Sequence, residues 1–373
     1  MSRYSDVLLA PAALAASPAS SAYPRLPAVD WAAIGAQAPA QLPVDYSGPD
    51  APLPEADIAV LTWTSAEWSA LDHVFVESGS AGARSSYELE HAWNLYSRGA
   101  AGLDTDHPLA PLWGYYQLVE IAGLRTLLFK CDAHLAHPPW LDGLEKMVQQ
   151  VLGDSKVSWI YSIGTAGGAD LGESLGDAVL ANAGHLEMKA PENAGAPINH
   201  QTFTGRDFPA TTVVDEVPPL LFKLSSVVTE SALQGLVQAL HAQLPDSAPF
   251  GLDDLLDPPL DPANLGAPKA LPKPGVPLLT TDYYFIASGD DAEQWAVLEM
   301  DDAVIAYVAA EEKAEFAFVR NISDPIVPVE TPDKRLIPDS VRDRWSGLVY
   351  ENYGLFTSCN GALITWAAIA GGA

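Results

Sequence analysis

Apolar residues along the chain recur with the two periods of regular structure, and their order predicts an alternation of strands and helices. Short apolar runs, as found in strands covered on both faces, occur at 56–63, 157–163 and 316–319. Apolar residues at helical spacing occur at 65–72, 141–152 and 303–310. Two further runs, at 116–121 and 126–131, flank Gly123 and predict a hairpin. The pattern therefore predicts an α/β protein.

Three stretches lack this regularity. Residues 1–54 are rich in Ala, Pro and Ser, a composition that cannot sustain regular structure for long and predicts an arm. Residues 73–115 carry few apolar repeats, and much of 207–277 is Pro-rich. We expect one domain over 55–373, with an elaboration at about 207–277 that serves as a lid or an oligomer contact.

Polar residues gather where the predicted strands end. Asp301 stands at the start of the helix at 303–310, and Arg320 and Asp324 follow the strand at 316–319. Open α/β sheets bind their ligands at the carboxyl ends of the strands. We therefore expect an active-site edge at this place.

A glycine-rich segment, 164–168, follows the strand at 157–163 and predicts a tight loop. Consecutive small residues let backbone N–H groups approach a sugar, a water or an anion, and Thr165 adds a hydroxyl. Glu67 lies in the first turn of the helix at 65–72. Taken alone, it would be an ordinary acid stabilised by the helix dipole.

Four blocks follow one another along the chain: 58–61, then 164–168 with 176–179, then 281–286, and finally 299–301 with 319–324. In this order they resemble the signature of the purine nucleoside phosphorylase and methylthioadenosine/S-adenosylhomocysteine nucleosidase superfamily. The resemblance implies a three-layer α/β/α fold with a twisted, mostly parallel central sheet. It also implies a purine nucleoside or nucleotide as substrate, and no cofactor.

The resemblance implies a catalytic role for several of these residues. Asp324 would be the general acid that protonates or hydrogen-bonds the purine N7. Asp301 would hold the ribose hydroxyls, in place of a family glutamate that is one methylene longer. Glu67 would activate the attacking water, helped by Arg320 and Thr165.

Five more residues are implied to bind the substrate. Tyr284 matches the aromatic residue that stacks on the base, and Phe285 is its neighbour. Met300 would pack beneath the sugar. Glu299 and Gly164 belong to the blocks that carry Asp301 and Thr165.

Hydrolysis of the N-glycosidic bond is the first of three functions that these residues leave open. Phosphorylases of the superfamily resemble one another in presenting arginines to phosphate, one of them just before the glycine turn, whereas residues 161–164 contain none. This favours water as the nucleophile, with a phosphate-dependent phosphorylase as the alternative if Arg206 or a neighbouring subunit supplies the cation. A non-catalytic nucleoside-binding protein on the same fold is the third function. The residues do not choose among thioethers, plain nucleosides and 5′-phosphorylated nucleotides.

Composition restricts the partners. The chain has 373 residues, 48 of them acidic and 19 basic, and a formal net charge of −29, which disfavours binding to nucleic acid or anionic lipid. Its apolar runs are shorter than the ~18 residues that a membrane span needs. We expect no nucleic acid and no membrane partner, and a homo-oligomer, either a dimer or a larger assembly.

Cysteine and histidine usage points to a cytoplasmic protein without a metal. Cys131 and Cys359 are too few for a disulfide framework, and the N-terminal segment lacks the features of a signal peptide. The spacing of His134 and His137 suggests metal ligands, but no cysteine or acid completes a set. We therefore expect no metal site.

Overall fold

The computed structural model describes residues 26–80, 82–100, 112–138, 140–170, 172–207, 212–256, 260–262, 265–287, 294–324 and 326–372. Residues 1–25 of the predicted arm and 101–111 of the stretch at 73–115 lie outside this part. The strands are β1 (Ala40–Gln41), β2 (Ile58–Thr62), β3 (Asn94–Tyr96), β4 (Gly114–Ile121), β5 (Leu124–Cys131), β6 (Trp159–Gly168), β7 (Ala178–Ala181), β8 (Ala183–Glu187), β9 (Thr202–Thr204), β10 (Ala270–Pro272), β11 (Leu278–Thr281), β12 (Val297–Glu299) and β13 (Glu315–Asp324). The α-helices are α3 (Ser65–Phe75), α4 (Ser86–Ala92), α5 (Trp140–Ser155), α6 (Thr212–Glu216), α7 (Glu230–Gln243), α8 (Leu252–Leu255), α9 (Asp302–Glu312) and α10 (Asp339–Gly372), and the 3-10 helices are η1 (Trp31–Ile34), η2 (Pro218–Leu220), η3 (Leu224–Ser226) and η4 (Pro245–Ser247).

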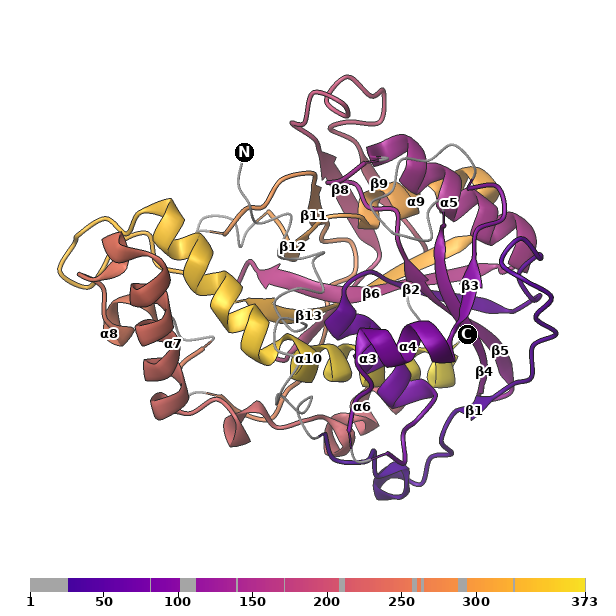
Figure 1. Ribbon diagram of the computed structural model, residues 1–373, viewed down its shortest axis with the longest axis horizontal. Coiled ribbons are helices and arrows are strands. Elements are labelled where there is room, and N and C mark those ends of the chain that lie inside the picture. The colour runs from indigo at the N-terminus through magenta and orange to yellow at the C-terminus, as the bar shows by residue number, and fades with distance from the viewer. Residues whose placement is uncertain are drawn as a thin grey trace.

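The described strands form one 13-stranded mixed sheet (Figure 1). Its main path is β1-β4-β5-β2-β6-β12-β11-β8-β9, and β13 pairs with both β6 and β7. The centre is parallel, since β2 pairs with β5 and β6 in this sense, and β13 pairs with β6. The neighbouring pairs β4–β5, β6–β12 and β7–β13 are antiparallel.

The expectation of a mostly parallel sheet therefore holds only at the centre. One reason is the turn between β4 and β5, where Ala122 and Gly123 both have positive φ values, 51° and 87°. A two-residue turn of this kind reverses the chain directly into an antiparallel hairpin. The hairpin at 116–121 and 126–131 was predicted from the sequence, and it forms with longer strands.

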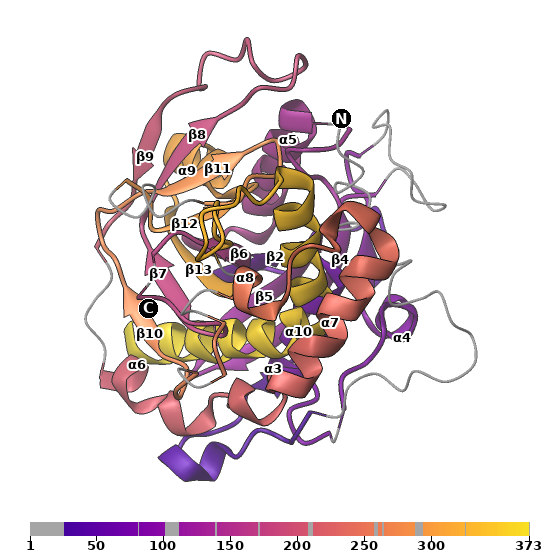
Figure 2. The same ribbon diagram turned by 90° about the vertical axis from the view of Figure 1, so that its left-hand side faces the viewer.

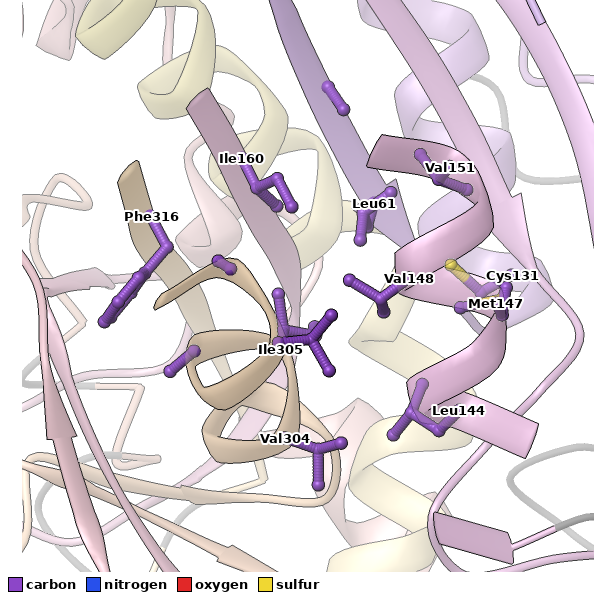
Figure 3. Packing of buried hydrophobic residues seen from close by; sticks show 14 of the residues in the cluster. Leu61, Cys131, Leu144, Met147, Val148, Val151, Ile160, Val304, Ile305 and Phe316 are labelled. Carbon is purple, nitrogen blue, oxygen red and sulfur yellow. The ribbon is translucent and has the colours of Figure 1, made fainter. Parts of the chain in front are cut away.

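Helices cover both faces of the sheet. On one face α5 and α9 pack against each other and against the central strands. Figure 3 shows Val148 of α5 and Ile305 of α9 pointing toward one another, and both are fully buried. On the other face α3 and α10 pack together on β6 and β13. Figure 2 shows that α10 changes direction along its length.

The glycine-rich segment at 164–168 is a strand, and the prediction of a tight loop was wrong. Backbone pairing to β13 continues through it, with Gly164 opposite Arg320 and Thr165 opposite Asn321. On its other side Gly168 pairs with β12. Arg320 and Asp324 likewise lie within β13 instead of after it, so the polar edge is built on paired strands.

Outside the sheet, the less regular stretches also contribute to the core. Trp31 of the N-terminal segment packs on Trp366 of α10, with ring centroids 4.8 Å apart. Within the stretch at 73–115, α4 and β3 are regular. Between residues 207 and 277, α7 and α8 form an apolar cluster with the first half of α10, including Trp345 and Leu348. The elaboration therefore supports the helix that faces the polar edge.

None of the described helices is by itself both long and apolar enough to cross a membrane. One bent pair, Pro218–Ser226 with Glu230–Gln243, reaches that length and composition when the two are taken together.

Candidate active site

One pocket brings together nine of the ten residues that the sequence predicted for the site. It spans about 840 Å³, open solvent at its mouth included, and lies where β2, β5, β6, β12 and β13 end, with α10 on one side. The nine residues that line it are Glu67, Thr165, Tyr284, Phe285, Glu299, Met300, Asp301, Arg320 and Asp324. The tenth, Gly164, lies directly behind Glu67 and Arg320.

Glu67 is a buried carboxylate with five hydrogen-bond donors. Its Oε2 accepts from the hydroxyl of Thr62 at 3.1 Å and from the N–H groups of Trp63 and Thr64 at 3.0 and 2.8 Å. Its Oε1 accepts from the N–H and the hydroxyl of Thr165, both at 2.8 Å. Thr64 caps α3 and forms a capping box with Glu67. The start of α3 and strand β6 therefore fix this carboxylate from both sides.

Arg320 lines the pocket with a guanidinium that is already bound to an acid. Its Nε donates to Asp302 Oδ2 at 2.7 Å, and its Nη2 donates to Asp302 Oδ1 and, at 2.8 Å, to the hydroxyl of Ser162. A Cβ atom at Gly164 would collide with Nη1 of Arg320 and lie 2.8 Å from Oε1 of Glu67. Glycine at this position therefore lets the two charged side chains lie against the β6 backbone.

Glu299 holds the N-terminus of α9. Its Oε2 accepts from the N–H groups of Asp301 and Asp302 at 2.6 and 2.9 Å, and its Oε1 accepts from the hydroxyl of Thr280. Burial, together with the neighbouring carboxylate of Asp302, raises the pKa of Glu299. The acceptors of Glu299 thus face the helix, although the side chain lines the pocket.

Asp301 is the N-cap residue of α9, but its side chain makes no capping hydrogen bond. Its Oδ1 accepts instead from the N–H of Leu135 at 3.0 Å, and its Oδ2 lies 3.3 Å from Nε2 of His134. Burial raises the pKa of Asp301 to about 8. The carboxyl group therefore faces the segment after β5 and the pocket.

Asp324 is a carboxyl group surrounded by hydroxyls. Its Oδ1 accepts from Ser323 at 2.6 Å, and its Oδ2 accepts from Ser346 at 3.1 Å and from Tyr284 at 3.3 Å. Burial raises the pKa of Asp324, while the three hydroxyl donors act in the opposite direction. A carboxyl group with a raised pKa is suited to donate a proton at neutral pH.

Aromatic and apolar side chains form the wall beside Asp324. Tyr284 directs its hydroxyl at Asp324 and at Ser346 of α10, the latter at 2.6 Å. Phe285 packs with Leu298 in a small apolar cluster. An aromatic wall next to a carboxyl group suits a flat, partly polar ligand such as a purine.

Two further residues beside the predicted acids come from distant parts of the chain and were not predicted. Nε2 of His134 lies 3.3 Å from Oδ2 of Asp301, and the hydroxyl of Ser346 donates to Asp324. His134 follows β5 at the same edge of the sheet as the other site residues, a position that would have indicated its role. Ser346 lies on a helix more than twenty residues away in sequence, and no local pattern marks it.

The two histidines do not form a metal centre. Nδ1 of His134 accepts from the N–H of Ala136 at 3.0 Å, and its Nε2 faces Asp301. Among the residues that the structure describes, no group of three or more His, Cys, Asp or Glu side chains is arranged to hold a metal ion.

No protein-family model matches this chain, and no curated protein matches it. Solved structures do match. The 5′-methylthioadenosine/S-adenosylhomocysteine nucleosidase of Neisseria meningitidis, in complex with methylthio-immucillin-A, is 12% identical with a TM-score of 0.43, and the match covers 84% of this chain and 98% of that one. The Campylobacter jejuni nucleosidase of the same name is 12% identical with a TM-score of 0.41, covering 84% and 99%.

The futalosine hydrolase of Helicobacter pylori is 11% identical to this chain, with a TM-score of 0.42, covering 84% of this chain and 96% of that one. These proteins are nucleosidases or hydrolases by name. Their TM-scores are below 0.5, and similarity at this level does not indicate what this chain does.

Proposed function

We propose that this protein hydrolyses the N-glycosidic bond of a purine nucleoside. The observation that carries the proposal is the convergence of Glu67, Asp301 and Asp324 on one pocket that also has an aromatic wall. The three carboxyl groups come from α3, the start of α9 and the end of β13. Cleavage of this bond needs one group at the leaving base, one at the sugar and one at the nucleophile, because positive charge develops on the sugar as the base departs.

At the base end, Asp324 acts as general acid. The purine leaves poorly as an anion, and a proton delivered toward N7 makes it a neutral leaving group. Burial, which raises the pKa of Asp324, favours the protonated form that this step needs. Tyr284 and Phe285 form the wall on which the base lies, and the Tyr284 hydroxyl keeps Asp324 in place.

At the sugar end, Asp301 accepts hydrogen bonds from the ribose hydroxyls, and Met300 packs beneath the ring. Both line the pocket at the start of α9. Glu67 receives the proton of the attacking water when the Thr165 hydroxyl turns from Oε1 toward that water, and Arg320 lies beside them. Water adds to the anomeric carbon as the C–N bond breaks, so the products are the free base and the free sugar.

Water suits this pocket better than phosphate. Two of the three nitrogens of the Arg320 guanidinium, Nε and Nη2, donate to Asp302 and Ser162, so they are not available as a two-pronged clamp for an anion. Arg206 packs over the ring of Trp159, 5.6 Å from its centroid, at the opposite end of β6 from the pocket. The same argument favours an uncharged nucleoside over a 5′-phosphorylated nucleotide.

The test is incubation of the purified protein with adenosine, methylthioadenosine and adenosine 5′-monophosphate, each with and without inorganic phosphate. We expect free adenine and free sugar from the first two compounds in phosphate-free buffer. A strict need for phosphate, with a sugar 1-phosphate as product, would favour the phosphorylase. Binding of adenosine without release of adenine from any compound would favour a nucleoside-binding protein.

A further inference from the structure

Asp301 is the N-cap residue of α9, but its side chain does not cap the helix. An aspartate at an N-cap position normally accepts a hydrogen bond from the second or third N–H of its helix. Here the Asp301 side chain makes no such bond: the N–H of Ala303 donates to the hydroxyl of Thr280, and the N–H groups of Asp301 and Asp302 donate to Glu299. The Asp301 carboxyl group is thereby available for another partner.

That partner is the segment immediately after β5. The N–H of Leu135 donates to Oδ1 of Asp301 at 3.0 Å, and Nε2 of His134 lies 3.3 Å from Oδ2. Oδ1 thus has one protein donor, and Oδ2 has a ring nitrogen within hydrogen-bonding distance. Since a carboxyl oxygen accepts up to two hydrogen bonds, both oxygens keep an acceptor site for a ligand.

The imidazole of His134 is itself oriented. The N–H of Ala136 donates to Nδ1 of His134 at 3.0 Å, so Nδ1 carries no proton and the hydrogen of the neutral ring is on Nε2. The ring is buried and packs edge to face on His137, with centroids 5.3 Å apart. The backbone of its own segment therefore keeps the ring hydrogen on Nε2, the nitrogen that lies 3.3 Å from Oδ2 of Asp301.

We propose that His134 is the positioning residue of the sugar site, and that its Nε2, 3.3 Å from Oδ2, fixes the carboxyl group of Asp301 in the orientation that hydrogen-bonds the vicinal hydroxyls of a ribose. The inference rests on the proposed function in one respect, the assignment of Asp301 to the sugar. It adds that recognition of a 2′,3′-diol depends on a residue 167 positions away from Asp301 in sequence. His134 acts through Asp301 and needs no contact with the substrate.

Binding can be measured without turnover by titration calorimetry with 9-deazaadenosine, a C-nucleoside that has no N-glycosidic bond, and with its 2′,3′-dideoxy derivative. The ratio of the two dissociation constants reports recognition of the diol. We expect the diol to improve binding to the wild-type protein by about tenfold or more, as two hydrogen bonds of ordinary strength do. Asp301→Ala should bring the ratio close to one, and His134→Ala should lower it about fivefold or more.

The double variant His134→Ala/Asp301→Ala decides how His134 acts. If His134 works through Asp301, the double variant keeps the ratio of Asp301→Ala. If the double variant instead lost the product of the two single-variant effects on this ratio, the two residues would act independently and the inference would be overturned. A wild-type ratio in His134→Ala would overturn it as well. Failure of the wild-type protein to bind 9-deazaadenosine would overturn it too.

Two conservative variants make the test independent of whether His134→Ala folds. The amide of His134→Gln reaches as far as Nε2 and should restore most of the ratio, whereas His134→Asn is too short and should behave like the alanine variant. Equal ratios in the two would contradict the inference. His137→Ala, a neighbour that is not among the described residues lining the pocket, is the matched control and should keep the wild-type ratio.

Adenine release from adenosine tests the proposed hydrolysis separately, so a protein that binds the diol through His134 but releases no adenine would refute only the hydrolysis.

Discussion

The two ends of the pocket hold carboxyl groups in contrasting surroundings. Glu67 accepts five hydrogen bonds, three of them from backbone N–H groups of Trp63, Thr64 and Thr165. Asp324 accepts from three side-chain hydroxyls, and no backbone N–H group donates to its carboxyl in the described part of the chain. Backbone donors cannot turn to accept a proton, whereas a hydroxyl donates or accepts as its rotor allows.

This difference suggests how one pocket can hold an acid and a base together. The fixed N–H groups around Glu67 hold its carboxyl group in one orientation. The rotatable hydroxyls around Asp324 suit a group that gains and loses a proton, and burial raises its pKa. A buried carboxyl group surrounded by rotatable hydroxyls is the better suited of the two to act as the acid.

The largest expected effect comes from removing the acid. Asp324→Asn should lower adenine release from adenosine by about 10²–10⁴-fold, the range for a positioned general acid. Because the protonated form is the active one, the wild-type rate should fall as pH rises through the raised pKa of Asp324, and the variant should lack this decline. Asp333→Asn, at an exposed position, should keep the wild-type rate and pH profile. Full activity of Asp324→Asn would remove the acid from the mechanism.

Glu67→Gln tests the end of the pocket that activates water. It should lower adenine release from adenosine by about 10²-fold, while nucleoside binding is retained. The glutamine places an amide N–H₂ against donors, so a loss of about 1–3 kcal/mol in stability is also expected. Glu88→Gln is a matched control, since Glu88 forms the same type of capping box with Ser85 at the start of α4 but does not line the pocket among the described residues. If both variants showed the same kinetics, Glu67 would be a structural cap alone.

Tyr284→Phe sharpens the account of Asp324 by removing one hydroxyl and keeping the ring. The loss of one hydrogen bond of 0.5–1.5 kcal/mol predicts a rate lowered by about 2–10-fold. Tyr283→Phe removes a hydroxyl that bonds to Lys189 and Glu187 instead, and it should change the rate less. Equal effects of the two substitutions would show that the Tyr284 hydroxyl has no particular role.

The smallest effect concerns stability and pH. Burial raises the pKa of Asp301 from its ordinary value of 3.8 to about 8. The unfolded chain loses this proton first, so the stability that Asp301 contributes at low pH is lost as pH rises through about 8. Asp301→Asn removes this titration. The Tm of the variant minus that of the wild type should therefore be larger at about pH 9 than at about pH 5, and each kcal/mol of stability corresponds to roughly 2 °C. A Tm difference that is the same at both pH values would contradict the raised pKa.

Sequence reasoning located the pocket because its residues fall in ordered blocks next to apolar runs. Asp301 and Arg320 follow recognisable patterns, and Glu67 lies just after a buried strand. The prediction from sequence was wrong where pairing between distant segments decides the structure. Residues 164–168 read as a loop from their glycines, but β12 and β13 pair with them and extend the strand.

Long-range contacts also explain the residues that were missed. His134 meets Asp301, and Ser346 meets Asp324, only after the hairpin and α10 are in place. Arg320 is an instructive intermediate case. Its position in the pocket was foreseen, but its ion pair with Asp302 depends on the arrangement of α9 beside β13, which no local pattern shows.

The most direct test of the division between Asp324 and Glu67 compares two leaving groups. p-Nitrophenyl β-D-ribofuranoside releases an anion that is stable without protonation, so its cleavage needs water activation but little help from an acid. The account predicts that Asp324→Asn slows adenosine cleavage by about 10²–10⁴-fold but cleavage of the nitrophenyl riboside by less than about tenfold, while Glu67→Gln slows both. Equal losses on both substrates for Asp324→Asn would contradict its role as the acid at the departing base.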